Sequence, residues 1–250
     1  MIVRTDAVVL RAMDYSETSR IATLLTRHHG VIGAVAKGAR RPTSRFGSTL
    51  QPGAYVQAVY YHRPNRGLQT LKEAAHLSRF PHTTADLGRA TAAFRILEVA
   101  RALLGEGEPH PPALEAVVRA LTFVDASPEL PANAVPWLQM KLATLLGFGP
   151  ALTRDALDEV DDDGGVLEVE TGQVWADPAE ARGTTLRASR AALRAFAVMA
   201  RTGLETAGRM RLEPHVRGEV EALADVYLRV HTDDTRPSRV QKVADQLDTP

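Results

Sequence analysis

The chain has 250 residues, enough for one large domain or two ordinary ones, and 44% of them are apolar, which supports a packed core. It contains no cysteine, which excludes disulfides and thiolate metal sites. The formal net charge is zero, but residues 1–80 carry 12 Lys and Arg against four Asp and Glu, which gives +8 there and −8 in the remainder. This asymmetry predicts a basic module that binds a polyanion, joined to an acidic module with a different task.

The first ten residues, MIVRTDAVVL, contain an acid at Asp6 and no small-residue cleavage site, so we do not expect a signal peptide. No uncharged run approaches the ~18 apolar residues of a membrane span. We therefore expect a cytoplasmic protein.

Five segments of the first eighty residues have the composition of β-strands, which favour Val, Ile, Leu and aromatic side chains. They are residues 3–11, 20–26, 31–37, 54–61 and 68–77. A tight reversal at His28, His29 and Gly30 follows the second, and RPNRG before the fifth is a hairpin signal. With one longer connection after the third strand, this order predicts a five-stranded Greek-key barrel of the OB type, a fold that binds single-stranded nucleic acid on one face.

The longer connection, residues 35–52 with the sequence VAKGARRPTSRFGSTLQP, is called here the basic connector. Four cations fall within nine of its residues, with no acid among them: Lys37, Arg40, Arg41 and Arg45. Its glycines and prolines exclude one continuous helix or strand. A cation-dense loop between strands is suited to a phosphate backbone, and the alternative is a solvated surface loop.

Other residues of the barrel extend this candidate site. Secondary cations are Arg20, Arg63 and Arg66, whereas Arg4, Arg11 and Arg27 could equally be ordinary surface residues. The rings available for base stacking are Phe46, Tyr55, Tyr60 and Tyr61, each of which favours the core over a stacking platform. Tyr60 and Tyr61 are adjacent in a strand and must point to opposite faces, so at most one belongs to the core.

From Pro81 onward the apolar period becomes helical, after the N-capping sequence HTTAD. Helices are predicted near residues 93–104, 114–124, 135–146, 186–201 and 212–230, and a short helix or disorder from Arg236. Residues 150–183 interrupt them, with a hairpin of residues 166–169 and 173–176 around Thr171 and Gly172. The predicted class is α+β: a barrel domain of residues 1–80, then a mainly helical domain of residues 81–250 with a small hairpin insertion.

Catalytic and metal-binding motifs are weak or absent in the sequence. There is no Gly-Lys-Ser/Thr loop, no HExxH and no GxSxG elbow. An acidic segment places Glu159, Asp161, Asp163 and Glu170 at EF-hand spacing. However, Thr171 and Gly172 stand where the exit helix should begin, and residues 166–169 alternate like a strand, which favours a solvated acidic turn over calcium. We expect neither an enzyme nor a bound cofactor.

The sequence resembles the RecO family of bacterial recombination and DNA-repair mediators. The resemblance is carried by AVVLRAMDYSETSRIATLLT, the basic connector, YVQAVYY and LQTLKEA in residues 1–80, and by KLATLLGFGP and RLEPHV in the helical half. It implies an OB-type barrel with a helical domain, binding of single- and double-stranded DNA, annealing of complementary strands and partnership with RecR. It further implies help in loading RecA onto DNA coated with single-stranded-DNA-binding protein, contact with the tail of that protein, and a nucleoid-associated location.

The sequence departs from the family pattern at one site. Many members carry two CxxC pairs for structural zinc, which here fall at Asp155 and Asp158 and near Trp175 and Pro178. Residues 150–183 are therefore expected to be a degenerate zinc module without zinc. We expect Trp175, Val166 and Leu167 to hold the hairpin by packing on the helices.

Three hypotheses follow. The leading one is a non-enzymatic mediator that binds DNA through Lys37, Arg40, Arg41 and Arg45, with Arg20, Arg63 and Arg66 as secondary contacts. The alternative is a protein–protein adaptor whose barrel mainly docks RecR, and the third, a hydrolase using the acids near Asp161, has no supporting constellation. Weak candidates for contact with the tail of single-stranded-DNA-binding protein are Lys141, Arg194, Arg201 and Arg217.

Overall fold

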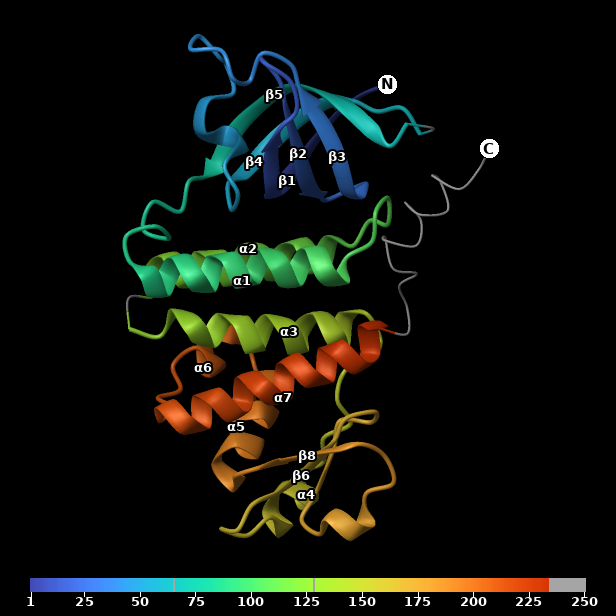
Figure 1. The fold of residues 1–250 in the computed structure, drawn as a ribbon, viewed down its shortest axis with the longest axis vertical. Helices are drawn as coiled ribbons and strands as arrows, with labels where there is room; N and C mark the ends of the chain where they lie inside the picture. Colours follow the sequence, from blue (N-terminus) through green and yellow to red (C-terminus); the bar gives the residue numbers. More distant parts are fainter. Residues whose placement is uncertain (65, 128, 234–250) are drawn as a thin grey trace.

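The computed structural model describes residues 1–64, 66–127 and 129–233. A β-barrel lies at one end of an elongated molecule, layers of helices follow, and a small sheet lies at the far end (Figure 1). None of the helices in the described ranges combines the length and the apolarity that crossing a membrane requires.

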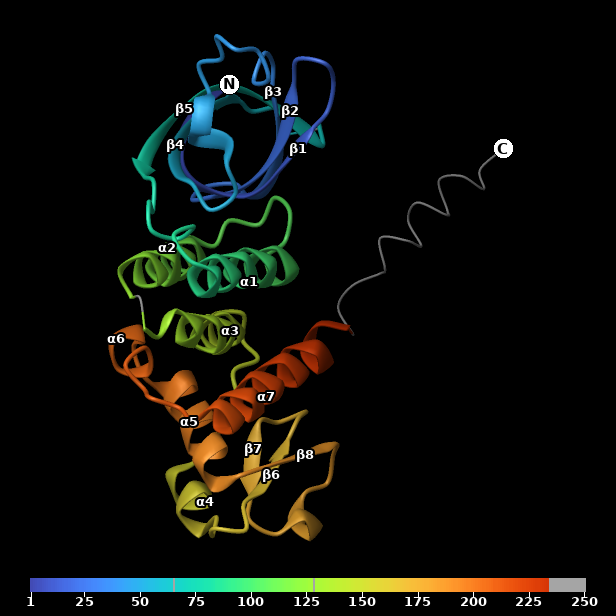
Figure 2. The same ribbon diagram turned by 60° about the vertical axis from the view of Figure 1, so that its left-hand side comes forward.

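The barrel is closed and has the strand order β1-β2-β3-β5-β4 (Figure 2). Neighbours are antiparallel except β3 and β5, which are parallel. The strands are β1 (Ile2–Asp14), β2 (Arg20–Thr26), β3 (Gly30–Ala36), β4 (Tyr55–Tyr61) and β5 (Leu68–Ser78). The predicted α+β class, with a five-stranded OB-type barrel followed by helices, is confirmed.

The basic connector joins β3 to β4 and packs its last residues into the barrel core. It leaves β3, passes through the 3₁₀ helix η1 (Gly47–Leu50) and enters β4. Phe46 and Leu50 are buried in the barrel core, and Ser48 Oγ lies 3.0 Å from Nε2 of His76 on β5. Two apolar anchors therefore hold the end of a segment whose earlier residues are mostly polar and exposed.

The helical part begins where Asp86 accepts a hydrogen bond from the backbone N–H of Arg89, the N-cap expected from the HTTAD sequence. Its helices are α1 (Leu87–Leu103), α2 (Pro111–Ala126), α3 (Ala134–Leu145), α4 (Arg154–Glu159), α5 (Arg190–Arg201), α6 (Leu204–Ala207) and α7 (Pro214–Asp233). In Figure 1, α1 and α2 form the layer next to the barrel, and α3 and α7 lie beyond them.

The barrel is attached to this helical layer by three kinds of contact. Val8, Leu25 and Val31 belong to the same apolar core as α1 and α2. The backbone of Val31 accepts a hydrogen bond from Gly107 N–H at 3.1 Å and donates one to the carbonyl of Gly105 at 3.3 Å. Arg27 Nη1 lies 2.9 Å from Glu115 Oε1 on α2. The end of the barrel that carries the β2–β3 turn is therefore covered.

At the far end lies a three-stranded sheet of order β7-β6-β8. Its strands are β6 (Gly165–Glu168), β7 (Gln173–Trp175) and β8 (Thr185–Ala188), with a 3₁₀ helix, η3 (Pro178–Glu180), before β8. The predicted hairpin is present, and Gly172 has the positive φ of +69° that its turn requires. The third strand was not predicted.

Several helix limits differ from the sequence prediction. The fourth predicted helix is present as α5, but its predicted start at residue 186 is wrong, because residues 185–188 pair with β6 and α5 begins only after Ser189, whose side chain caps it. The short helices α4 and α6 were not predicted. A strand follows the acidic segment of residues 159–164, and Glu170 accepts hydrogen bonds from the backbone N–H of Thr184, so an EF-hand does not form. The prediction for Arg236 onward lies outside the described residues.

Candidate nucleic-acid interface

The cation-rich part of the basic connector is an exposed turn at the end of β3. Lys37 follows the strand directly, and Gly38 has a φ of +75°, which turns the chain. The backbone N–H of Arg41 donates to the carbonyl of Gly38 at 3.1 Å. Lys37, Arg40 and Arg41 are all exposed. A tight turn therefore presents three cations from one end of the barrel.

Asp14 joins two of the predicted cations. Its Oδ1 lies 2.9 Å from Nε of Arg20, and its Oδ2 lies 3.3 Å from Nε of Arg40. Arg40 also donates through Nη1 to the carbonyl of Ser16 at 2.8 Å, and its backbone N–H donates to the carbonyl of Thr18 at 3.1 Å. The β1–β2 loop and the basic connector therefore form one surface, in which one carboxylate partly compensates two arginines.

The other cations of the connector are uncompensated. Within residues 1–64, 66–127 and 129–233, neither Lys37, Arg41 nor Arg45 forms an ion pair. The guanidinium carbon of Arg45 lies 5.4 Å from the ring centroid of buried Phe46, a cation–π contact that directs this side chain along the barrel. These three side chains give the surface its net positive charge.

Arg63 and Arg66 lie apart from this group, on the turn between β4 and β5. The side chain of Gln69 organises the turn, accepting from Arg63 N–H at 2.7 Å and donating to the carbonyl of Arg66 at 2.8 Å. Leu68 at the start of β5 pairs with Gly33, in the middle of β3. Figure 1 shows this hairpin extending to one side, away from the loop that leaves β3. The structure thus divides the seven predicted cations into two groups.

The four aromatic rings that were candidates for base stacking differ in their exposure to solvent. Tyr60 is fully buried, and its hydroxyl lies 2.8 Å from Nδ1 of His29; burial raises the pKa of Tyr60 to about 12. Tyr61 next to it is 41% exposed, as the alternation predicts. Phe46 is buried, and the half-buried Tyr55 directs its hydroxyl toward Asp6 at 3.5 Å. Of the four rings, Tyr61 is the one exposed for stacking.

Sequence reasoning missed a second exposed ring. Tyr15, in the β1–β2 loop, is 61% exposed and precedes Ser16, whose carbonyl accepts from Arg40. Its place in the motif DYSETS, between two predicted strands, is the signal that could have identified it.

Sequence reasoning also missed a mainly apolar row on the outside of the barrel. The strand registers place Met13 opposite Ile21, Ile21 opposite Val35, Val35 opposite Thr70, and Thr70 opposite Tyr61. We call these five residues the outer stripe. It crosses all five strands, runs from beside Arg20 to two residues before Arg63, and contains exposed Met13 and Tyr61. It therefore connects the two groups of cations.

The residues at the zinc positions do not suit zinc. Asp155 and Asp158 lie on α4, where Asp158 pairs with Arg194 at 3.6 Å, and Trp175 donates its indole N–H to Glu168 at 3.4 Å. In the described part of the chain, no three His, Cys, Asp or Glu side chains come together in a way that could hold a metal ion. An indole and a proline cannot take the place of thiolates.

A buried carboxylate holds this region together instead. Glu168 Oε1 accepts from the backbone N–H groups of Arg182 and Gly183 at 2.9 and 2.8 Å, and Oε2 accepts from the Thr171 hydroxyl at 2.8 Å. These hydrogen bonds, led by that of Thr171, lower the pKa of Glu168. Val166 and Leu167 are buried, as the sequence predicted, but the contribution of Glu168 was not foreseen.

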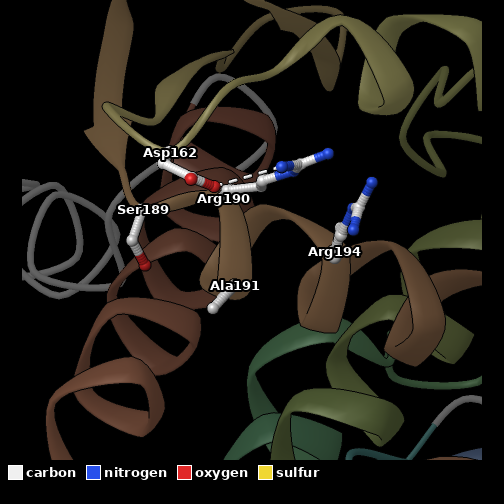
Figure 3. A pocket seen from close by; sticks show the side chains of 5 residues that line it. All are labelled: Asp162, Ser189, Arg190, Ala191 and Arg194. Atoms are coloured by element: carbon white, nitrogen blue, oxygen red, sulfur yellow. Dashed lines mark hydrogen bonds and ion pairs between the residues drawn. The ribbon is translucent and has the colours of Figure 1, made fainter.

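The four weak candidates for a peptide tail lie in different places. Arg194 lines a cavity of about 380 Å³ with Asp162, Ser189, Arg190 and Ala191 (Figure 3). Arg201 donates to the carbonyl of Leu152, and Arg217 donates to Asn133 Oδ1 at 2.8 Å, so both support the fold. Lys141 is exposed on α3. The structure does not bring these four cations together.

Comparison with known proteins agrees with this architecture. Residues 1–80 match the family profile described as recombination protein O N terminal, and residues 84–239 match the one described as recombination protein O C terminal. The chain is 47% identical to the DNA repair protein RecO of Salinibacter ruber over 250 residues, covering 99% of this chain and 95% of that protein. It is 32% identical over 175 residues to the DNA repair protein RecO of Chlorobaculum parvum, covering 70% of this chain and 67% of that protein. The chain belongs to the RecO family, which supports a role in DNA repair and recombination.

Proposed function

We propose that this protein is a non-enzymatic recombination mediator that binds single- and double-stranded DNA and anneals complementary strands. The observation that carries the proposal is the exposed, uncompensated set of Lys37, Arg41 and Arg45 on the basic connector, beside the outer stripe. Cations on a loop and apolar or aromatic side chains on an adjacent sheet face are the two components of single-strand binding.

The two components have different tasks in this proposal. The connector cations neutralise phosphates of either a single strand or a duplex, which gives affinity without sequence preference. Unpaired bases contact Tyr61 and the aliphatic residues of the outer stripe, which a duplex cannot do because its bases are stacked inside. Two strands held close to these cations repel each other less, and complementary bases can then pair.

The assignment extends to domains, partners and location. The barrel of residues 1–80 is the DNA-binding domain, and residues 81–250 form the helical domain. RecR is the direct partner, RecA is loaded indirectly, and the tail of single-stranded-DNA-binding protein is bound at a site that includes one or more of the helical cations. The protein acts in the cytoplasm, on the nucleoid.

Fluorescence anisotropy with labelled oligonucleotides tests the DNA-binding surface. About four neutralised phosphates give a log–log salt slope of roughly −3 for single strands. The triple substitution Lys37→Ala, Arg40→Ala, Arg41→Ala should weaken binding strongly, flatten that slope and slow the annealing of complementary oligonucleotides. The matched control removes the same charge from the helical half: Lys141→Ala, Arg154→Ala, Arg187→Ala. Equal effects of the two triple variants would contradict the assignment of the connector.

A second function is favoured by the aliphatic side chains on the outside of the barrel. Ile2, Met13 and Leu68 are exposed, and exposed apolar patches mark protein interfaces as well as nucleic-acid surfaces. In this alternative the barrel mainly docks RecR. The variant Met13→Gln, Leu68→Gln separates the two: loss of co-migration with RecR in the absence of DNA, with unchanged DNA affinity, would favour the adaptor.

A further inference from the structure

A small cavity lies on the outside of the barrel, and none of the residues of the outer stripe lines it. Its volume is about 200 Å³, and it lies over β1, β4 and β5. Arg4 pairs with Val59 in the strand register, and Val59 pairs with Glu73, so these three side chains form one outward-facing row. Arg45 reaches the same cavity from the basic connector, and Ala74 and Ala75 also line it. Two distant segments thus contribute one arginine each.

The charge of this cavity is positive. In the described part of the chain, neither Arg4 nor Arg45 has an ion-pair partner. The one carboxylate in the lining, Glu73, lies 3.4 Å from Nζ of Lys72. The next acid along β1, Asp6, lies 3.6 Å from Nε of Arg27. Both nearby acids are therefore compensated by other cations, and the two arginines are not.

The size and position of the cavity limit what it can hold. About 200 Å³ lies below the ~300–1,000 Å³ of sites that enclose a small molecule, so a group smaller than a whole nucleotide fits. Arg4 is the diagonal cross-strand neighbour of Tyr61, because it pairs with Val59 two residues earlier on β4. Such neighbours are about 7–8 Å apart, within reach of long side chains. The cavity thus adjoins the Tyr61 end of the outer stripe.

We propose that this cavity is a phosphate subsite, in which Arg4 and Arg45 bind one phosphodiester of a DNA strand whose base contacts Tyr61. Guanidinium groups bind phosphate with paired hydrogen bonds, and two of them converging from different segments hold it in a defined place. The subsite rests on the proposed DNA-binding function. The subsite gives Arg4 a role in DNA binding, whereas the sequence alone is equally consistent with an ordinary surface cation. It also directs the DNA strand from the connector across the outside of β4.

The test compares three single variants by anisotropy with a labelled single strand over a range of salt. Arg4→Gln should weaken binding and reduce the salt slope by about 0.7, the value for one released counterion. Arg79→Gln removes another exposed arginine, which follows β5 and does not line the cavity. It should leave the slope unchanged. Ala75→Leu fills the cavity without changing charge and should reduce affinity and slope in the same way as Arg4→Gln.

Each outcome has a definite meaning, provided that thermal melting shows all three variants folded. If Arg4→Gln and Arg79→Gln have equal effects, or if Ala75→Leu binds like the unaltered protein, the subsite is overturned. Should the connector triple variant lose binding at the same time, the proposed DNA-binding function would stand without it. An unaltered protein that does not bind DNA at all would overturn both. Competition with inorganic phosphate at constant ionic strength separates a site for free phosphate, which it would block, from one that requires the DNA strand.

Discussion

Asp14 and Arg40 form an ion pair, with 3.3 Å between Oδ2 and Nε, that fastens the basic connector to the end of β1. The same carboxylate also compensates Arg20. We predict that Asp14→Asn tightens DNA binding, because it removes a negative charge from the surface and releases two arginines. An exposed pair of this kind contributes about 0–1 kcal/mol, so the gain in affinity should not exceed roughly fivefold. Anisotropy at several salt concentrations measures it. Weaker binding would show that Asp14 serves mainly to order the connector.

Substitutions of the adjacent residues Tyr60 and Tyr61 should have different effects, one on the stability of the fold and the other on DNA affinity. Tyr61→Ala removes an exposed ring and should reduce single-strand affinity by about 1–3 kcal/mol, with a smaller effect on duplex. Tyr60→Phe removes the hydroxyl that contacts His29 inside the barrel and should cost roughly 1 kcal/mol of unfolding free energy without changing DNA affinity. Anisotropy and urea unfolding of both variants make the comparison. Equal losses of duplex and single-strand binding in Tyr61→Ala would exclude base stacking.

Glu168 should make the far end of the molecule sensitive to acid. Its folded-state pKa is lowered, so its stabilisation is complete above the ordinary glutamate pKa of about 4.3 and is lost as the pH falls through the lowered folded value. Glu168→Gln places an amide nitrogen among hydrogen-bond donors and should lower the melting temperature at pH 7. That difference should shrink toward pH 3. The control is Glu180→Gln, at an exposed residue of η3, and a pH-independent difference for Glu168→Gln would contradict the assignment.

Two glycines with positive φ should respond differently to alanine. Gly30 has a φ of +60°, and a Cβ there would overlap the backbone of Glu108, in the segment that attaches the barrel to the helices. Gly47 has a φ of +47°, but a Cβ there would meet open space. Gly47→Ala should therefore cost only the backbone strain, about 1–2 kcal/mol, and Gly30→Ala should cost more. Chemical denaturation measures the loss of unfolding free energy in both variants. Equal losses would show that the segment around Glu108 shifts to accommodate the new Cβ.

The barrel was predictable because each strand is a local pattern. All five predicted strands occur within a few residues of their observed limits, as in residues 20–26, where prediction and structure coincide. The fourth predicted helix is present as α5, but its start was placed four residues too early: residues 185–188 are a strand because β6 supplies a partner, and no local pattern reveals a partner. Ser189 was an available signal, since serine is a common N-cap.

The candidate site was predictable as a set of residues but not as a surface. The density of cations in residues 37–45 is visible in the chain itself. That Asp14 compensates Arg40 together with Arg20, and that Arg63 and Arg66 lie apart, depends on which strand ends are neighbours. The positions of Glu168 and the outer stripe depend on strand pairing in the same way.

Period and composition are local properties, so the sequence alone establishes the class of the fold, the positive charge of the first eighty residues and the division into strands and helices. The tertiary structure alone shows which arginines of the barrel have ion-pair partners, which face of β4 is outside and that Arg4 and Arg45 line one cavity. The physical reason is that a closed barrel brings residues of distant segments to the same place. Their electrostatic and packing partners follow from that closure and from the strand registers, not from neighbours along the chain.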